Sequence, residues 1–136
     1  MKKIFILAAL IVCNYNIQAQ MLTINNNTTC SITYSVIASD PATCDAAYNS
    51  VDYVIPAGSF ANYSNCSSLA WIGLPAPAGS VVSGITVLDD GQLRFAGAIC
   101  VPLPSNTSYT SSCSGLSVTV TWTDNGDGTA TVNINN

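Results

Sequence analysis

The sequence predicts an all-β protein: one disulfide-stabilised antiparallel β-sandwich of about eight to ten short strands, either immunoglobulin-like or jelly-roll-like. A small β-barrel is the alternative. Three observations favour this class. β-Branched residues alternate with polar residues in many short runs, turn residues recur roughly every eight to twelve positions, and no amphipathic helical pattern is present.

The clearest element is a hairpin at the C-terminal end. Its two arms carry alternating apolar residues, at Val118, Val120, Trp122, Ala130, Val132 and Ile134. Residues 124–128 between them contain an Asn-Gly and an Asp-Gly step, which tolerate positive φ and favour a tight turn. Because an isolated hairpin is marginally stable in water, its apolar face must pack on other strands.

The other expected strands lie at residues 22–26, 30–38, 51–55, 60–64, 81–88, 93–100 and 109–113. Asp89-Asp90-Gly91 predicts a turn, after which Leu93, Phe95, Gly97 and Ile99 are expected to face the core. Residues 39–50 predict a loop with one helical turn at 45–48. Residues 69–74, which include Trp71, are expected to be buried on both sides, and residues 75–79 to form an exposed link.

The N-terminal segment has the pattern of an export signal. Lys2 and Lys3 precede an apolar run at residues 4–12, and Ile17-Gln18-Ala19 suits cleavage after Ala19. The run is too short to span a bilayer. We therefore expect a signal peptide at 1–19, one domain at 20–136, and a secreted or cell-surface location of bacterial type.

Cys13 raises the alternative of a lipid-anchored protein, since a cysteine after an apolar run can be a lipidation site. The residue before such a cysteine is normally small, whereas here it is Val12. We expect no lipid attachment.

The charge inventory of residues 20–136 is sparse and acidic. Arg94 is the single basic residue against seven aspartates, which leaves a net charge of −6, and the whole chain contains no histidine. No basic surface can neutralise phosphates, so nucleic acid and anionic lipid are unsuitable partners. The high apolar fraction, 49% of the chain, favours a packed domain over disorder.

Five cysteines follow residue 19, which in an exported domain predicts disulfides rather than metal ligation. We expect the pairs Cys44 with Cys66 and Cys100 with Cys113, because each brackets a loop-rich segment. Cys30 is then the odd cysteine, either buried and inert or bridged to a second chain.

The sequence gives no support for catalysis, a cofactor or a metal. Without histidine or glutamate, and with no lysine after residue 19, the usual proton-transfer groups are missing. Asp89 and Asp90 fit a turn better than a catalytic or calcium-binding pair, because adjacent strand residues point to opposite faces. A calcium loop starting at Asp124 would place Gly126 and Gly128 at ligand positions and lacks the closing Glu. We expect a non-enzyme.

Two kinds of surface remain as candidates for binding. One is a polar face on the last hairpin, formed by Thr119, Thr121, Thr123, Thr129, Thr131 and Asn133. The other is an aromatic platform for sugars: Trp71 and Trp122 are expected in the core, whereas Tyr48, Tyr63 and Tyr109 are expected to be more exposed.

These features favour an exported, non-catalytic sandwich that acts through its surface in adhesion, an extracellular matrix or an appendage. Its partner would be a protein, either itself or a cell-surface protein, or a glycan, and an exposed edge strand could support homo-oligomers. In that case residues 22–26 could be exchanged between subunits. A secreted carbohydrate-binding module is the alternative, and a small secreted toxin or inhibitor is the second.

Overall fold

The computed structural model describes residues 22–44, 47–77, 79–98, 100, 102–126 and 129–136. These ranges contain ten β-strands and one short 3₁₀-helix, η1 (Cys66–Ser68). The strands are β1 (Leu22–Asn26), β2 (Ile32–Ser39), β3 (Ala47–Asn49), β4 (Tyr53–Ile55), β5 (Phe60–Tyr63), β6 (Val81–Asp89), β7 (Gln92–Gly97), β8 (Asn106–Thr110), β9 (Ser117–Asp124) and β10 (Ala130–Asn135). The predicted signal peptide and Cys13 lie outside the described residues.

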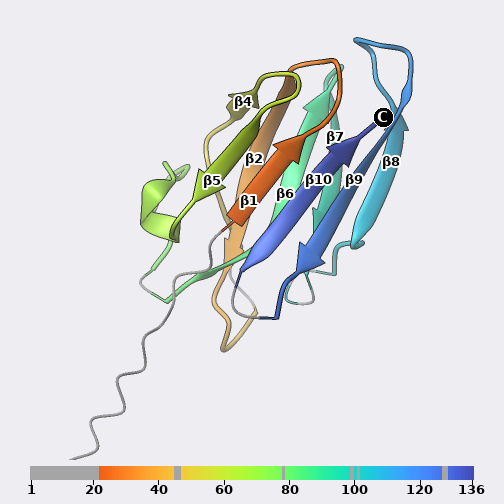
Figure 1. Ribbon diagram of the computed structural model, residues 1–136. Helices are drawn as coiled ribbons and strands as arrows, with labels where there is room; N and C mark the ends of the chain where they lie inside the picture. The colour runs from red at the N-terminus through yellow and green to blue at the C-terminus, as the bar shows by residue number, and fades with distance from the viewer. Residues whose placement is uncertain (1–21, 45–46, 78, 99, 101, 127–128) are drawn as a thin grey trace, which may run out of the picture.

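The strands form two sheets that pack face to face (Figure 1). Sheet A has the order β5-β1-β10-β9-β8, and sheet B has the order β3-β2-β6-β7 with β4 also paired to β2. The described strands thus form two separate sheets without closure into a barrel. The predicted β-sandwich is confirmed.

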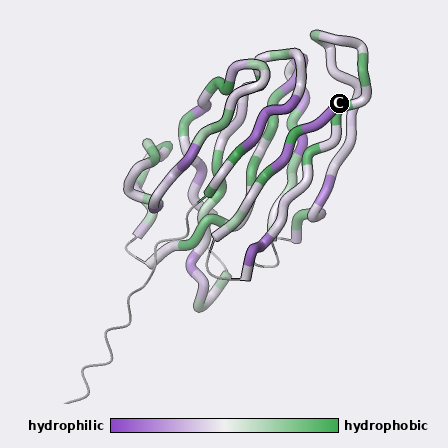
Figure 2. Tube along the Cα trace, viewed as in Figure 1, coloured by the Kyte–Doolittle hydropathy of each residue, from purple (hydrophilic) through white to green (hydrophobic). Residues whose placement is uncertain are grey.

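Sheet A is organised around the predicted C-terminal hairpin. In the antiparallel pair of β9 and β10, Trp122 lies opposite Val132. On the other side of β10, β1 adds in parallel, with Ile24 opposite Val132, so sheet A is mixed rather than purely antiparallel as predicted. This register puts the apolar residues of all three strands on one face, and Figure 2 shows the hydrophobic and hydrophilic positions alternating along β1 and β10.

Sheet B is organised around β6, which pairs with β2 and β7. The β6–β7 connection is the predicted tight turn: Asp90 and Gly91 both have positive φ, 49° and 72°, as a two-residue hairpin loop of the primed type requires. The pairing of β2 with β6 shifts between Ile37 and Ala38, which marks a bulge or irregularity.

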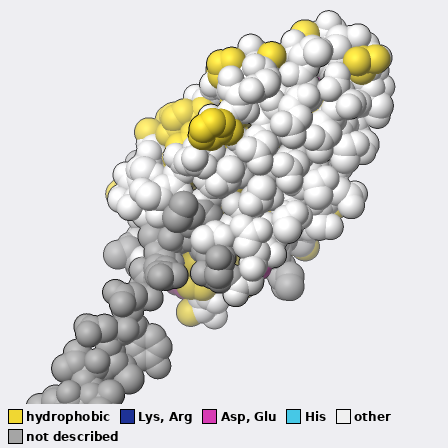
Figure 3. Space-filling model, in the orientation of Figure 1, with side chains coloured by type: hydrophobic (Ala, Val, Ile, Leu, Met, Phe, Trp, Pro, Cys, Tyr) yellow, Lys and Arg dark blue, Asp and Glu magenta, His cyan; other side chains and the backbone are white. Residues whose placement is uncertain are grey.

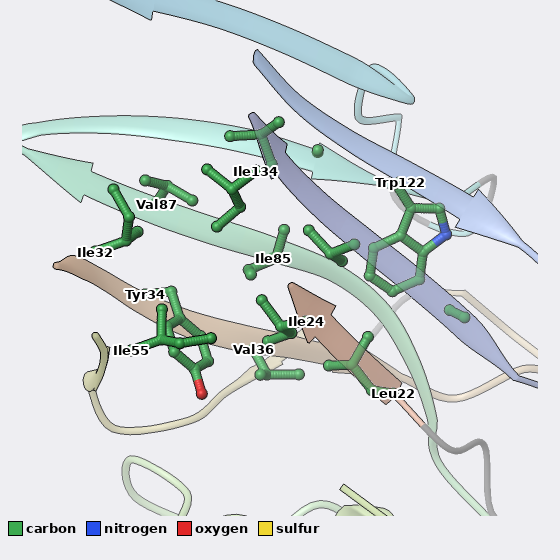
Figure 4. Packing of buried hydrophobic residues seen from close by; sticks show 14 of the residues in the cluster. Leu22, Ile24, Ile32, Tyr34, Val36, Ile55, Ile85, Val87, Trp122 and Ile134 are labelled. Carbon is green, nitrogen blue, oxygen red and sulfur yellow. The ribbon is translucent and has the colours of Figure 1, made fainter. Parts of the chain in front are cut away.

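The core lies between the sheets, where Val36 and Ile85 from sheet B meet Ile24 from sheet A (Figure 4). Trp122 is 5% exposed, so its predicted core position is confirmed. The fully buried apolar side chains are mostly β-branched, which suits the pleated faces they cover.

The predicted phase of β7 is wrong. Ala96 faces the core and lies opposite Ile85, whereas Leu93 and Phe95 face outward and are 52% and 37% exposed. The two-residue turn fixes this phase, because it pairs Asp89 with Gln92 and therefore every later residue of β7 with a set partner on β6. Ile99 lies outside the described residues.

Three further segments differ from the prediction. Residues 69–74 form a loop in which Leu69 is buried but Ile72 and Leu74 are 65% and 79% exposed. Strand β8 begins and ends earlier than the predicted strand at 109–113. The predicted helical turn at 45–48 lies partly outside the described residues, and Ala47–Asn49 is strand β3.

Two disulfides lie within the described residues, Cys30–Cys113 and Cys44–Cys100, while Cys66 is a free thiol. The predicted pairs, and the assignment of Cys30 as the odd cysteine, are therefore wrong. Cys30 precedes β2 and Cys113 follows β8, so their bridge ties sheet B to sheet A. The error arose because nearness along the chain does not decide which loops the fold brings together.

Candidate binding surfaces

The outer face of sheet A is a broad array of hydroxyl and amide groups, which we call the hydroxyl–amide face. Each member alternates with a core residue of its strand. The face includes Thr23, Asn25, Asn62, Asn106, Ser108, Thr119, Thr121, Thr123, Thr131 and Asn133. Phe60, opposite Asn25 on β5, adds one exposed aromatic ring at its edge. Figure 3 shows a surface that is neither charged nor apolar over most of this side.

Hydrogen bonds between side chains hold much of this face in place. Thr23 Oγ1 donates to Asn62 Oδ1 at 2.8 Å, and Asn25 Nδ2 donates to Asn133 Oδ1 at 3.0 Å. The Ser108 and Thr119 hydroxyls lie 3.0 Å apart. These bonds join neighbouring strands, so the array is fixed before any partner arrives and loses little side-chain entropy on binding.

The sequence prediction identified part of this face. Thr119, Thr121, Thr123, Thr131 and Asn133 all lie on it. Thr129 precedes β10 in the turn, where its hydroxyl accepts a hydrogen bond from Asn125 Nδ2 at 2.8 Å.

Strands β1, β5 and β8 supply the residues of the face that the sequence prediction missed. Their alternation of polar and apolar residues was a usable signal, but only the sheet order shows that they extend the hairpin face. Asp124, at the end of β9, is the one charged residue in the five described strands of sheet A.

The outer face of sheet B has a different character. Val54 is 65% exposed on β4, and its partner across the sheet is Thr33. Thr33 in turn pairs with Leu88, which pairs with the exposed Leu93. Val54, Leu93 and the neighbouring Phe95 thus expose apolar side chains on the outer side of sheet B, in contrast to the hydroxyl–amide face.

A pocket of about 430 Å³ lies at the end of the sandwich where β6 turns into β7. Its lining residues are Asp89, Asp90, Gln92, Arg94, Tyr109, Thr110, Ser111 and Ser112. The Arg94 guanidinium carbon lies 5.9 Å from the centre of the Tyr109 ring, within the range of a cation–π contact. This contact joins a strand of sheet B to a strand of sheet A.

The two adjacent aspartates in this pocket have separate roles. Asp89 accepts hydrogen bonds from the backbone N–H of Ser112, at 3.0 Å, and from the Ser112 hydroxyl. Asp90 is exposed and occupies the turn position with positive φ. The turn prediction is confirmed, and Asp89 in addition fastens the loop after β8 to the end of β6.

Tyr109 was expected at the surface but is only 8% exposed. Its hydroxyl is buried and has no hydrogen-bond partner among the described residues. Burial, reinforced by the nearby Asp89 and partly offset by Arg94, raises the pKa of Tyr109 to about 12. A buried hydroxyl without a partner costs about 1–3 kcal/mol of stability.

The remaining aromatic residues close the side of the sandwich next to β5. Tyr34 and Tyr63 share a 2.6 Å hydrogen bond between hydroxyls, and the Tyr53 ring packs at a tilt beside both rings. Trp71 is half-buried against the core, and its indole N–H donates to the Cys66 carbonyl at 2.9 Å. Tyr48 and Tyr63 are both partly exposed. The rings of Tyr34, Tyr53, Tyr63 and Trp71 pack in or against the core and do not form a flat platform for a sugar.

Asp124, considered above as the start of a calcium loop, and Cys66, the free thiol, both have structural roles. The Asp124 carboxylate accepts a hydrogen bond from the backbone N–H of Gly126 at 2.9 Å, as in a turn, while Asp127 and Gly128 lie outside the described residues.

The half-buried Cys66 thiol donates a hydrogen bond to the Ser80 carbonyl, and burial raises the pKa of this thiol, which keeps it protonated and less reactive. Within the described ranges, no three metal-binding side chains cluster, and no helix is long and apolar enough to cross a membrane.

In comparisons with known proteins, no family model, curated protein or solved structure matches the chain.

Proposed function

We propose that this protein is an exported, non-catalytic β-sandwich that acts through its surface, as an adhesive, matrix or appendage component. The hydroxyl–amide face carries the proposal. It extends across all five strands of sheet A, and cross-strand hydrogen bonds join three pairs of its side chains. A flat, uncharged and ordered face suits contact with another extended polar surface better than enclosure of a substrate.

The disulfides support an exported role. Bonds such as Cys30–Cys113 and Cys44–Cys100 form and persist in oxidising compartments. They agree with the export signal expected at residues 1–19, and the low charge suits a protein that meets neutral polymers or other copies of itself.

The two pairings of β1 limit which strands are free to pair with another copy of the chain. β1 pairs with β10 on one side and β5 on the other, both within the same chain. Within sheet A, assembly by adding a strand would therefore use one of the two edge strands, β8 or β5, and on β5 Phe60 is 69% exposed. Exchange of β1 would first have to break both of its present pairings.

Charge substitutions on the face test the proposal. Thr121→Lys and Thr131→Lys place a desolvation penalty and repulsion in the middle of the array, and should abolish retention on the polymer or self-association that the wild type shows. The matched control is Thr33→Lys, on a strand of the opposite sheet, which should keep wild-type behaviour. The probes are insoluble cellulose, chitin and β-1,3-glucan in pull-downs, and light scattering after size exclusion for self-association.

Retention of the double lysine variant at the wild-type level would overturn the role of this face. A wild-type protein that stays monomeric and binds none of the three polymers would count against the proposal as a whole.

A further inference from the structure

The pocket beside the β6–β7 turn has a floor built from both sheets. Arg94 lies opposite Val87, which is fully buried, so the Arg94 side chain leaves β7 toward the interior. Tyr109 lies opposite the buried Val118 and likewise leaves β8 toward the interior. The two side chains meet as a stacked pair between the sheets.

Arg94 brings strong hydrogen-bond donors to this floor. A guanidinium has five N–H donors in a fixed fork. Among the described residues, the acceptors recorded for Arg94 are the Gln92 side chain and, at a long 3.4 Å, its neighbour's carbonyl on Leu93. The Asp89 carboxylate is instead occupied by Ser112. Much of the donor capacity of Arg94 is therefore available to another molecule.

The Tyr109 hydroxyl is a second group of the pocket that could bind a ligand. It is more than nine-tenths buried, it lines the pocket, and its hydroxyl has no partner among the described residues. A neutral hydroxyl both donates and accepts. A small side-chain shift that brought it into contact with a ligand would satisfy a group that the folded protein otherwise leaves unpaired.

The rim of the pocket supplies acceptors and further hydroxyls. Asp90 contributes an exposed carboxylate, and Thr110, Ser111 and Ser112 also line the pocket. Two carboxylates and one guanidinium give the pocket a net negative charge, which disfavours phosphate and simple carboxylates. The guanidinium in turn disfavours a bare cation.

We propose that this pocket binds one residue of a neutral sugar, such as the end of a glycan chain. Adjacent sugar hydroxyls both donate and accept, so one ligand can accept from Arg94 and Tyr109 while it donates to Asp90. The pocket volume of about 430 Å³ falls in the range of small-molecule sites, roughly 300–1,000 Å³. This site is separate from the hydroxyl–amide face, and its failure would leave the proposed function of that face intact.

The test is a titration of ¹⁵N-labelled protein with glucose, galactose, mannose and N-acetylglucosamine, each followed by NMR up to about 50 mM, since single-sugar affinities near the millimolar range are expected. At least one sugar should shift the amide signals of residues 89–94 and 109–112. Tyr109→Phe and Arg94→Lys should each weaken that sugar's binding about tenfold, while both variants keep a folded spectrum.

Two further variants distinguish sugar binding in the pocket from sugar binding elsewhere on the surface. Asp90→Asn keeps a residue type that accepts positive φ and should weaken binding, because it removes the charged acceptor. Thr121→Val, on the hydroxyl–amide face, should leave the titration unchanged.

Three results would overturn the proposal. One is the absence of shifts with all four sugars. Another is a sugar response confined to the hydroxyl–amide face. The third is a response to glycine, a zwitterion, that exceeds the response to every sugar, which would reassign the pocket to amino-acid-like ligands.

Discussion

The Arg94 guanidinium lies over the Tyr109 ring, 5.9 Å from its centre, and connects β7 of one sheet to β8 of the other. It is the only basic residue that the structure describes, and its partly buried side chain leaves β7 on the face that packs against the other sheet. The pair lines the polar pocket at one end of the sandwich, and it makes Tyr109 the most informative residue for testing the structure.

Removing the Tyr109 hydroxyl should not destabilise the fold. Tyr109→Phe eliminates a buried hydroxyl without a described partner, so we expect the free energy of unfolding to stay constant or to rise by about 1 kcal/mol. Urea denaturation followed by fluorescence measures it. Tyr34→Phe is the matched control: it removes a hydroxyl bonded to Tyr63 at 2.6 Å and should cost about 1 kcal/mol. Equal losses in both variants would show that Tyr109 has a bonded hydroxyl.

Alkaline pH should destabilise the protein partly through Tyr109. Its pKa is 10.0 when unperturbed and about 12 in the folded protein. The folded state therefore keeps its proton where the unfolded state loses it, so the stabilisation is complete below pH 10 and is lost as the pH rises from 10 to 12. Urea midpoints across this range should fall less steeply in Tyr109→Phe. A Cys66→Ser background prevents thiol exchange, and identical slopes with and without Tyr109 would contradict the assignment.

The disulfide connectivity can be read directly. Proteolysis without reduction, followed by mass spectrometry, should yield the peptide pairs Cys30–Cys113 and Cys44–Cys100, with Cys66 in neither pair and open to alkylation without reduction. Since Cys30 and Cys113 are 83 residues apart, replacing both with serine should lower the free energy of unfolding by about 4 kcal/mol. Cys66→Ser is the control and should cost far less. A Cys44–Cys66 peptide would contradict the structure.

Gly97 should tolerate no side chain. A Cβ there would lie 2.5 Å from the Ser83 carbonyl oxygen and 3.0 Å from the Gly84 Cα, both backbone atoms of the adjacent strand. We expect Gly97→Ala to destabilise the protein by about 2 kcal/mol or more, measured by thermal unfolding. Leu103 also approaches this position, at 3.1 Å.

The double variant Gly97→Ala/Leu103→Ala distinguishes the clash with the backbone of β6 from the clash with the Leu103 side chain. It should not recover the stability of Leu103→Ala alone, because the closest obstacle is backbone. Recovery would instead assign the strain to the Leu103 side chain.

Local sequence pattern predicted much of the fold. The period of two on both arms of the hairpin placed Trp122 and Val132 in the core, and the Asp89-Asp90-Gly91 turn was recognised from residues that accept positive φ. Such features succeed because strand alternation and turn geometry depend on a few neighbouring residues. The same reasoning failed for β7, where hydrophobicity favoured Phe95 as a core residue but the turn register assigned that place to Ala96.

By itself, then, the sequence determined the fold class, the terminal hairpin and the uncharged character of its outer face, since each follows from alternation and composition. Tertiary structure decided the rest: the parallel addition of β1 to β10, the partners Cys30 and Cys113, and the meeting of Arg94 with Tyr109. The first two join segments far apart along the chain, and the third joins neighbouring strands that belong to different sheets. Their proximity depends on how the two sheets are ordered and stacked, and no local pattern encodes that choice.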